Sequence, residues 1–118
     1  MHGQATILAV DDCAENLHIL SAALKAQYKI KVALNGKRAL ELALAAPQPD
    51  LILLDVMMPD MDGYEVCTAL KRDPQTAAIP VLFLSSRDEE QDEAMGLSLG
   101  AIDYIVKPIR PSIVQARV

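Results

Sequence analysis

Five short apolar runs, separated by stretches with helical periodicity, constrain the fold of this chain more than any other feature. Three of these runs, at 6–10, 51–54 and 81–84, are nearly continuous, which is typical of strands buried on both faces of a parallel sheet. The run at 29–32 instead alternates lysine with an aliphatic residue, which indicates an edge strand with one exposed side. A shorter run at 104–106 predicts the fifth strand.

The segments between the runs have the periodicity of amphipathic helices. Leu17, Leu20 and Leu24 recur at i, i+3 and i+7. Further helices are predicted at 39–44, 64–72 and 89–99, the last with Gly100 as its C-cap, and Pro111 stands where a fifth helix would begin. This alternation predicts an α/β fold with a doubly wound, flavodoxin-like parallel sheet of strand order 2-1-3-4-5 and helices on both faces. In such sheets, ligands bind at the carboxyl ends of the strands, near the switch point between the first and third strands.

Composition excludes several classes of function. The 118 residues suit one domain, and eleven basic against sixteen acidic side chains give a net charge of −5, which argues against direct nucleic-acid binding. We find no signal peptide and no apolar stretch of about 18 residues, so we expect no membrane span and a cytoplasmic location. Cys13 and Cys67 match no metal-binding spacing. We expect two free thiols, buried or half-buried.

Three carboxylates fall where a doubly wound sheet binds its ligand. Asp11 and Asp12 directly follow the first apolar run, and Asp55 directly follows the third. An acid at the end of a buried strand costs free energy unless it has a partner, and three anions in one cleft repel each other. A hard divalent cation with oxygen ligands, Mg²⁺ or Mn²⁺, would relieve that repulsion. The alternative is three unrelated helix-capping acids, since aspartate is a common N-cap residue.

Ser85 and Lys107 follow the fourth and fifth apolar runs. With Asp55 as nucleophile and a metal ion, a hydroxyl and an ammonium complete a set of groups that can hold a phosphoryl group. Taken singly, Lys107 would be interpreted as a surface residue and Ser85 as a helix cap. Their positions at the ends of different strands of one predicted sheet favour a common site.

Two other functions, phosphatase activity and nucleotide binding, fit these residues less well. A phosphatase of the haloacid dehalogenase type also uses a strand-end aspartate, Mg²⁺, a hydroxyl and a lysine. It needs a second aspartate two residues after the nucleophile, where this chain has Met57. A nucleotide-binding function is not supported, because the chain contains neither GxGxxG nor GxxxxGK[ST].

Two stretches resemble the response-regulator receiver family: DVMMPDMDG at 55–63 and GAIDYIVKP at 100–108. The paired acids Asp11 and Asp12 also match that family, so the resemblance covers essentially the whole chain. It implies a signalling domain rather than an enzyme, one that catalyses its own phosphorylation and dephosphorylation. It further implies that Asp55 is the phosphoacceptor. Asp11, Asp12 and Asp55 would bind the metal ion, together with the backbone carbonyl of Met57.

The same resemblance implies roles for residues at the ends of the last two strands. Ser85 would bond the phosphoryl group and carry the signal, although Ser86 offers a second hydroxyl beside it. Lys107 would pair with the phosphoryl group, and the peptide bond preceding Pro108 would be cis. Tyr104 matches a switch aromatic that turns inward on activation.

The resemblance also implies partners. A sensor histidine kinase or phosphotransfer protein would donate the phosphoryl group. Phosphorylation would change the surface formed by segments 89–99 and 104–106 and the helix from Pro111, which could also mediate a dimer. The residues after Pro108 resemble receivers that continue into an output domain, so residues 1–118 are expected to be the N-terminal receiver of a longer protein. That output would be cyclic-di-GMP synthesis or breakdown, or a kinase. The alternatives are a phosphoryl relay and a phosphate-independent interaction module.

Overall fold

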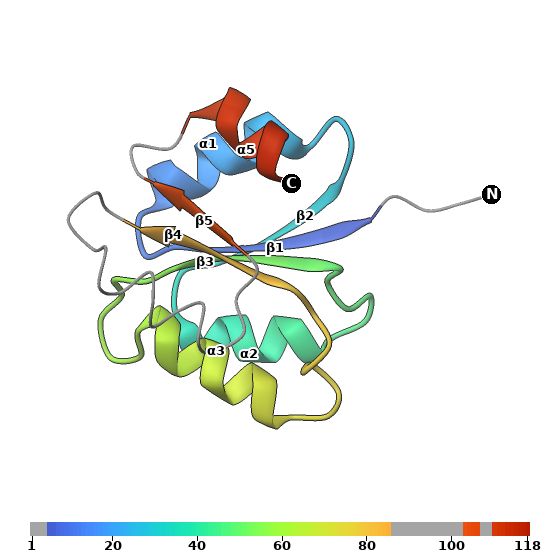
Figure 1. Cartoon of the computed structure of the whole chain (residues 1–118), viewed down its shortest axis with the longest axis vertical. Helices are drawn as coiled ribbons and strands as arrows, with labels where there is room; N and C mark the ends of the chain where they lie inside the picture. Colours follow the sequence, from blue (N-terminus) through green and yellow to red (C-terminus); the bar gives the residue numbers. More distant parts are fainter. Residues whose placement is uncertain (1–4, 86–102, 107–109) are drawn as a thin grey trace.

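The computed structural model describes residues 5–85, 103–106 and 110–118, and its centre is a five-stranded parallel sheet (Figure 1). The strand order is β2-β1-β3-β4-β5, as the sequence predicts. The strands are β1 (Thr6–Val10), β2 (Lys29–Ala33), β3 (Leu51–Asp55), β4 (Val81–Ser85) and β5 (Asp103–Val106). Thus β3 and β4 each run one residue beyond the apolar pattern, onto a polar side chain.

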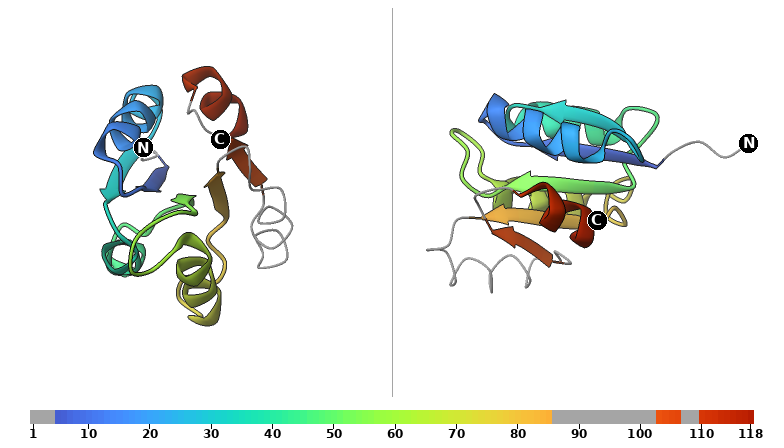
Figure 2. Two further views of the ribbon diagram at one scale, coloured as in Figure 1. Left: turned by 90° about the vertical axis from the view of Figure 1, so that its left-hand side faces the viewer. Right: turned by 90° about the horizontal axis from the view of Figure 1, so that it is seen from above.

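Helices cover both faces of the sheet (Figures 1 and 2). On one face lie α1 (Ala14–Leu24) and α5 (Pro111–Arg117), and on the other lie α2 (Gly36–Leu44) and α3 (Gly63–Arg72). Alternate residues of the central strands point to opposite faces and build two separate cores, one containing Leu54 and Phe83 and the other Leu53 and Leu84. The helix predicted at 89–99 lies outside the described residues.

Capping side chains determine where α2 and α3 begin. The side chain of Asn35 accepts a hydrogen bond from the Arg38 backbone N–H at 2.8 Å, and that of Asp62 accepts one from Glu65 at 2.9 Å. Both helices therefore begin before their first apolar residue, at positions 36 and 63 rather than the predicted 39 and 64. The last helix begins at Pro111 as predicted.

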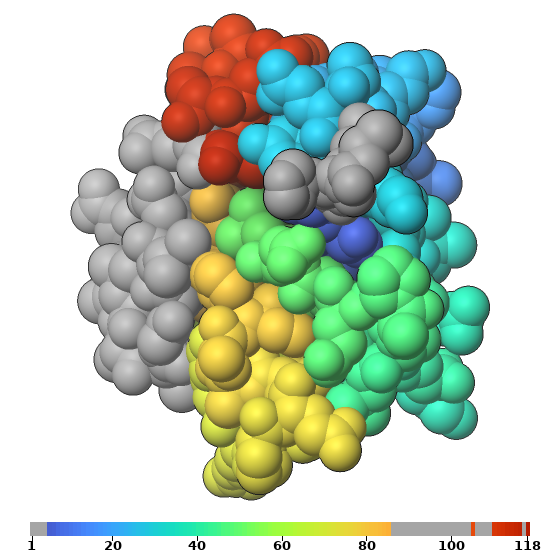
Figure 3. All heavy atoms as spheres, turned by 90° about the vertical axis from the view of Figure 1, so that its right-hand side faces the viewer, coloured from blue at the N-terminus to red at the C-terminus, as the bar shows by residue number. Residues whose placement is uncertain are grey.

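Strand β2 is the edge strand that its alternating sequence predicts, and its Val32 side chain is 47% exposed. Figure 3 shows the face at the amino ends of the strands, where the segments leading into β3 and β4 lie side by side. There the Gln48 amide donates to the Gln75 carbonyl at 3.0 Å, and Asp50 exchanges two hydrogen bonds with the Thr6 backbone. None of the described helices is long and apolar enough to cross a membrane.

Candidate metal and phosphoryl site

Strands β1, β3 and β4 end at the same edge of the sheet and bring the predicted site residues together. Val10 pairs with Leu54 in the parallel register, so the residues that follow them, Asp11 and Asp55, are neighbours. Asp55 in turn pairs with Leu84, which immediately precedes Ser85. The carboxyl ends of three adjacent strands thus place two acids and a hydroxyl side by side, at the position where doubly wound sheets bind their ligands.

Asp11, Asp12 and Asp55 form one cluster, with a carboxylate oxygen from each within 4.8 Å of the others. Asp11 and Asp55 are buried, at 0% and 1% exposure, whereas Asp12 is exposed. Oxygen atoms are the ligands that Mg²⁺ and Mn²⁺ prefer, and a divalent charge would offset the repulsion among three carboxylates. The donor set therefore fits a hard divalent cation that enters from the solvent side, past Asp12.

Hydrogen bonds hold the buried carboxylate of Asp11. The backbone N–H of Cys13 donates to Oδ1 at 2.9 Å, and the side-chain amide of Asn16 donates to Oδ2 at 3.0 Å. Asn16 is not among the site residues that the sequence pattern predicts. Its position in the first turn of α1, where side chains commonly reach back past the N-cap, is the signal that could have identified it.

Ser85 lies at the end of β4 and is 1% exposed. Its Oγ makes no hydrogen bond within the part of the chain that the structure describes. Because a buried hydroxyl without a partner costs free energy, this position is poised to donate to a group that enters the site. Ser86 lies outside the described residues.

The β3–α3 loop, residues 56–62, folds back over the end of β3. Gly63 donates its backbone N–H to the Val56 carbonyl at 2.9 Å, and a Cβ at Gly63 would lie only 2.9 Å from the Cα of Val56 and closer still to the Asp55 carbonyl. Asp60 has a φ of 68°, in the left-handed region that aspartate tolerates better than most residues. The tight return keeps the start of α3 against Asp55.

The methionines of the β3–α3 loop have different environments. Met57, whose carbonyl is the predicted metal ligand, has a side chain that is 64% exposed. Met58 is buried in the core beneath α2 and α3, and Met61 is partly buried against the same core. Met58 and Met61 therefore pack, as expected for methionine, and Met57 faces solvent beside the acidic cluster.

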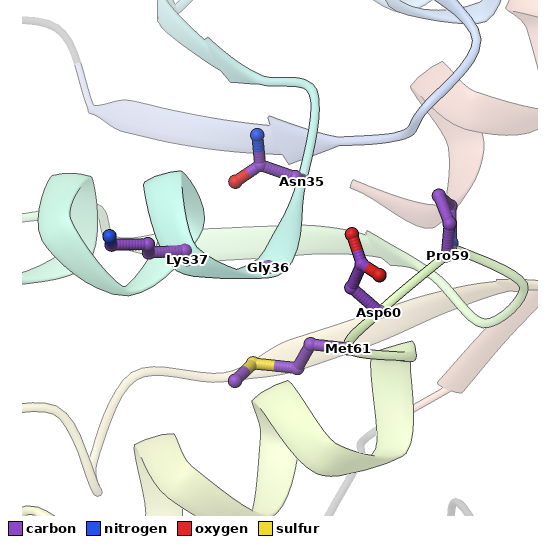
Figure 4. Close-up of a pocket in the computed structure, with 6 residues that line it drawn as sticks. All are labelled: Asn35, Gly36, Lys37, Pro59, Asp60 and Met61. Carbon is purple, nitrogen blue, oxygen red and sulfur yellow. The ribbon is translucent and has the colours of Figure 1, made fainter.

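A pocket of about 370 Å³ lies beside the β3–α3 loop and is lined by the six residues labelled in Figure 4: Asn35, Gly36, Lys37, Pro59, Asp60 and Met61. They come from the start of α2 and from the β3–α3 loop. Asp11, Asp12 and Asp55 are not among these lining residues, so the acidic cluster is not part of this pocket.

Of the remaining predicted site residues, Tyr104 lies in a described strand, whereas Lys107 and Pro108 lie outside the described residues. Position 104 lies in β5 and pairs with Phe83 of β4, so the predicted switch residue Tyr104 occupies the strand beside the one that carries Ser85. Phe83 also stacks edge-on with Tyr64 of α3, with ring centroids 5.2 Å apart. The predicted roles of Lys107 and of a cis bond before Pro108 concern residues outside the described ranges.

Neither cysteine forms a disulfide, as expected, but only Cys67 has the predicted environment. Cys67 is buried in the core beneath α2 and α3, and this burial raises the pKa of its thiol. Cys13, predicted to be buried or half-buried, is exposed, because it precedes α1 at the solvent edge of the acidic cluster. His18 faces solvent, as its place on the polar side of α1 predicts.

The geometry and the comparisons with known proteins agree on one family. The model of the response regulator receiver domain matches residues 7–118, and the chain belongs to this family. It is 47% identical over 115 residues to the response regulator PleD of Caulobacter vibrioides, with 97% of this chain and 25% of that protein aligned. It is 46% identical over 115 residues to a Vibrio cholerae protein named "Probable cyclic di-GMP phosphodiesterase", with 98% of this chain and 26% of that protein aligned.

The fold is also that of solved receivers. The chemotaxis protein CheY4 of Vibrio cholerae superposes with a TM-score of 0.90 at 32% identity, over 98% of this chain and 96% of that one. The chain spans about a quarter of the length of PleD and of the Vibrio cholerae relative.

Proposed function

We propose that this domain accepts a phosphoryl group on Asp55, with a divalent cation held by Asp11, Asp12, Asp55 and the backbone carbonyl of Met57. The observation that carries the proposal is the convergence of three carboxylates within 4.8 Å beside the buried hydroxyl of Ser85, which makes no hydrogen bond to any described residue. Mg²⁺ bound there would neutralise charge on the phosphoryl oxygens during transfer. The donor would be a sensor histidine kinase or phosphotransfer protein, as for receivers in general.

The chain's own residues account for the rest of the chemistry. A carboxylate oxygen of Asp55 attacks phosphorus, the bond from phosphorus to the donor's leaving atom breaks, and the leaving group departs with the electron pair. The product is an acyl phosphate on Asp55. The Ser85 hydroxyl, already desolvated, donates a hydrogen bond to a phosphoryl oxygen, and the ammonium of Lys107 supplies a counter-charge.

The direct test is to incubate the protein with acetyl phosphate and Mg²⁺ and to measure its intact mass. We expect the addition of one phosphoryl group, located by peptide mapping to the segment that contains Asp55, and no addition when a chelator replaces Mg²⁺. Failure to incorporate any phosphoryl group in the presence of Mg²⁺ would favour the alternative of a phosphate-independent interaction module.

Mg²⁺ is expected to stabilise the folded domain. A ligand that binds only the folded state adds roughly 2.7 kcal/mol to the free energy of unfolding at about 100 times its dissociation constant. Thermal melts across a Mg²⁺ series should therefore rise and saturate, and Asp12→Ala should lose the dependence. Asp60→Asn, which changes an exposed acid outside the cluster, should retain it. A melting temperature that changes with neither Mg²⁺ nor chelator would contradict the metal site.

Ser85 is expected to couple phosphorylation to the rest of the fold. A phosphoryl group that draws the Ser85 hydroxyl inward would favour a second packing of segment 89–99, β5 and α5, and the shift is limited by the difference in affinity for the two packings. Ser85→Ala should leave Asp55 able to accept the phosphoryl group while removing the amide chemical-shift changes at β5 and α5. Ser85→Thr keeps the hydroxyl and should preserve them. Wild-type changes confined to the β3–α3 loop would indicate a phosphoryl relay rather than a switch.

We propose further that residues 1–118 are the N-terminal receiver of a longer protein and that phosphorylation controls its output through the surface of segment 89–99, β5 and α5, either directly or through a dimer. The Vibrio cholerae relative's name supports an output that breaks down cyclic di-GMP. Expression of the longer protein and assay of cyclic-di-GMP turnover, with and without phosphorylation, tests this assignment. Phosphorylation-independent turnover would contradict the proposed control.

A further inference from the structure

Helix α1 begins beside the acidic cluster, and hydrogen bonds connect its first turn to Asp11 of that cluster. The side chain of the N-cap residue Cys13 makes no capping hydrogen bond to this end of the helix. Instead, its backbone N–H donates to Oδ1 of Asp11, and the amide of Asn16 donates to Oδ2. Each oxygen of Asp11 thus accepts a hydrogen bond from the start of α1.

These two bonds act on a deeply buried acid of the cluster. Asp11 is fully buried at 0% exposure, and a buried carboxylate without hydrogen bonds is strongly disfavoured. Because the bonds reach both oxygens at 2.9 and 3.0 Å, they restrict the rotation of the carboxylate. A carboxylate oxygen has two lone pairs, so it can accept a hydrogen bond and coordinate a cation at the same time.

A substitution can remove the side-chain donor of Asn16 but not the backbone donor of Cys13. The Cys13 N–H is present whatever side chain stands at position 13, whereas the bond to Oδ2 exists only because residue 16 is an asparagine of suitable length. Asn16 is half-buried, and its hydrogen bond to Asp11 connects it to the cluster. An uncharged amide also orients the carboxylate without supplying the positive charge that a lysine or arginine would bring.

We propose that Asn16 is a positioning residue of the metal centre: it orients Asp11 for the divalent cation and so sets the affinity of the site. The inference rests on the proposed metal site, and it assigns to α1 a part in the site beyond covering the sheet. Hydrogen-bond partners of metal ligands commonly contribute a factor of about 10 to 100 in metal affinity.

The competing explanation is that Asn16 only stabilises the start of α1. In that case its loss would lower the free energy of unfolding by the same amount with and without metal and would leave the dissociation constant unchanged. If Asn16 positions Asp11, its loss instead changes the difference in free energy between the metal-bound and the metal-free folded protein. The dissociation constant for the metal therefore separates the two explanations, and global stability alone does not.

The experiment is a titration of the unphosphorylated protein with MgCl₂, followed by backbone amide chemical shifts. Asn16→Ala is expected to weaken Mg²⁺ binding by about tenfold. His18→Ala, at an exposed position on the same helix, is the matched control and should stay within about twofold of the wild type. In the wild type, the side-chain amide resonances of Asn16 should shift with the same dissociation constant as the backbone amides of the acidic cluster.

The outcomes are distinguishable. Asn16→Ala with the wild-type dissociation constant, or Asn16 amide resonances that ignore Mg²⁺ while the cluster responds, would overturn the positioning role and leave the metal site intact. Absence of saturable Mg²⁺ binding in the wild type would overturn the proposed metal site itself. Asn16→Ala is expected to fold, because alanine is the best helix former and position 16 is only half-buried.

Discussion

Asp55→Asn is expected to abolish the incorporation of a phosphoryl group from acetyl phosphate. Asparagine keeps the shape of the side chain at the end of β3 but removes the anionic oxygen that attacks phosphorus, and an amide is a far weaker nucleophile. Asp55 is 1% exposed and pairs with Leu84 of β4, so the sheet holds its backbone in place in the variant. Intact mass after incubation with Mg²⁺ and acetyl phosphate measures the effect.

Controls separate loss of the acceptor from loss of the fold. Asp60→Asn, the same substitution on the same loop, should incorporate one phosphoryl group like the wild type, because Asp60 lies outside the acidic cluster and asparagine also tolerates its φ of 68°. Asp55→Asn removes one of three crowded charges, so its metal-free free energy of unfolding should not fall by more than about 1 kcal/mol. Full labelling of a folded Asp55→Asn protein would refute Asp55 as the acceptor.

Gly63→Ala is expected to destabilise the domain by about 3 kcal/mol, the upper end of the usual range for overpacking. The added Cβ would meet the backbone of Asp55 and Val56, including the Val56 Cα at 2.9 Å, and backbone atoms cannot rotate away as a side chain can. The strain would be relieved by displacing either the start of α3 or the end of β3. Urea unfolding measures the loss in stability, and a weaker response to Mg²⁺ should accompany it because Asp55 moves.

Gly36→Ala is the matched control, since Gly36 also occupies the first position of its helix. There the added Cβ would meet the Val66 and Met61 side chains at 2.8 and 2.9 Å, and the flexible thioether of Met61 can move aside. We expect a loss of about 1 kcal/mol and no change in the response to Mg²⁺. Equal losses for the two variants would contradict the argument that Gly63 is required by the Asp55 backbone.

Strand order and burial could be predicted from the sequence because they depend on patterns within each segment. The continuous apolar runs of β1, β3 and β4 report burial on both faces, and the alternation of β2 reports an edge. The ends of β3 and β4 were predicted one residue short, since the polar side chains of Asp55 and Ser85 interrupt the apolar pattern while backbone pairing continues beneath them. An apolar pattern therefore predicts too early an end for a strand whose last residue is polar.

The candidate site divides in the same way. The sequence by itself determined which acids follow which strands, and the parallel topology then required Asp11, Asp12 and Asp55 to meet at one edge. The tertiary structure alone decided that Asp11 is buried and Asp12 exposed, that Asn16 reaches Asp11, and that Gly63 lies against the Asp55 backbone. These contacts depend on how closely α1 and α3 pack on the sheet, a distance set by side chains from several elements at once and therefore not encoded in any one segment.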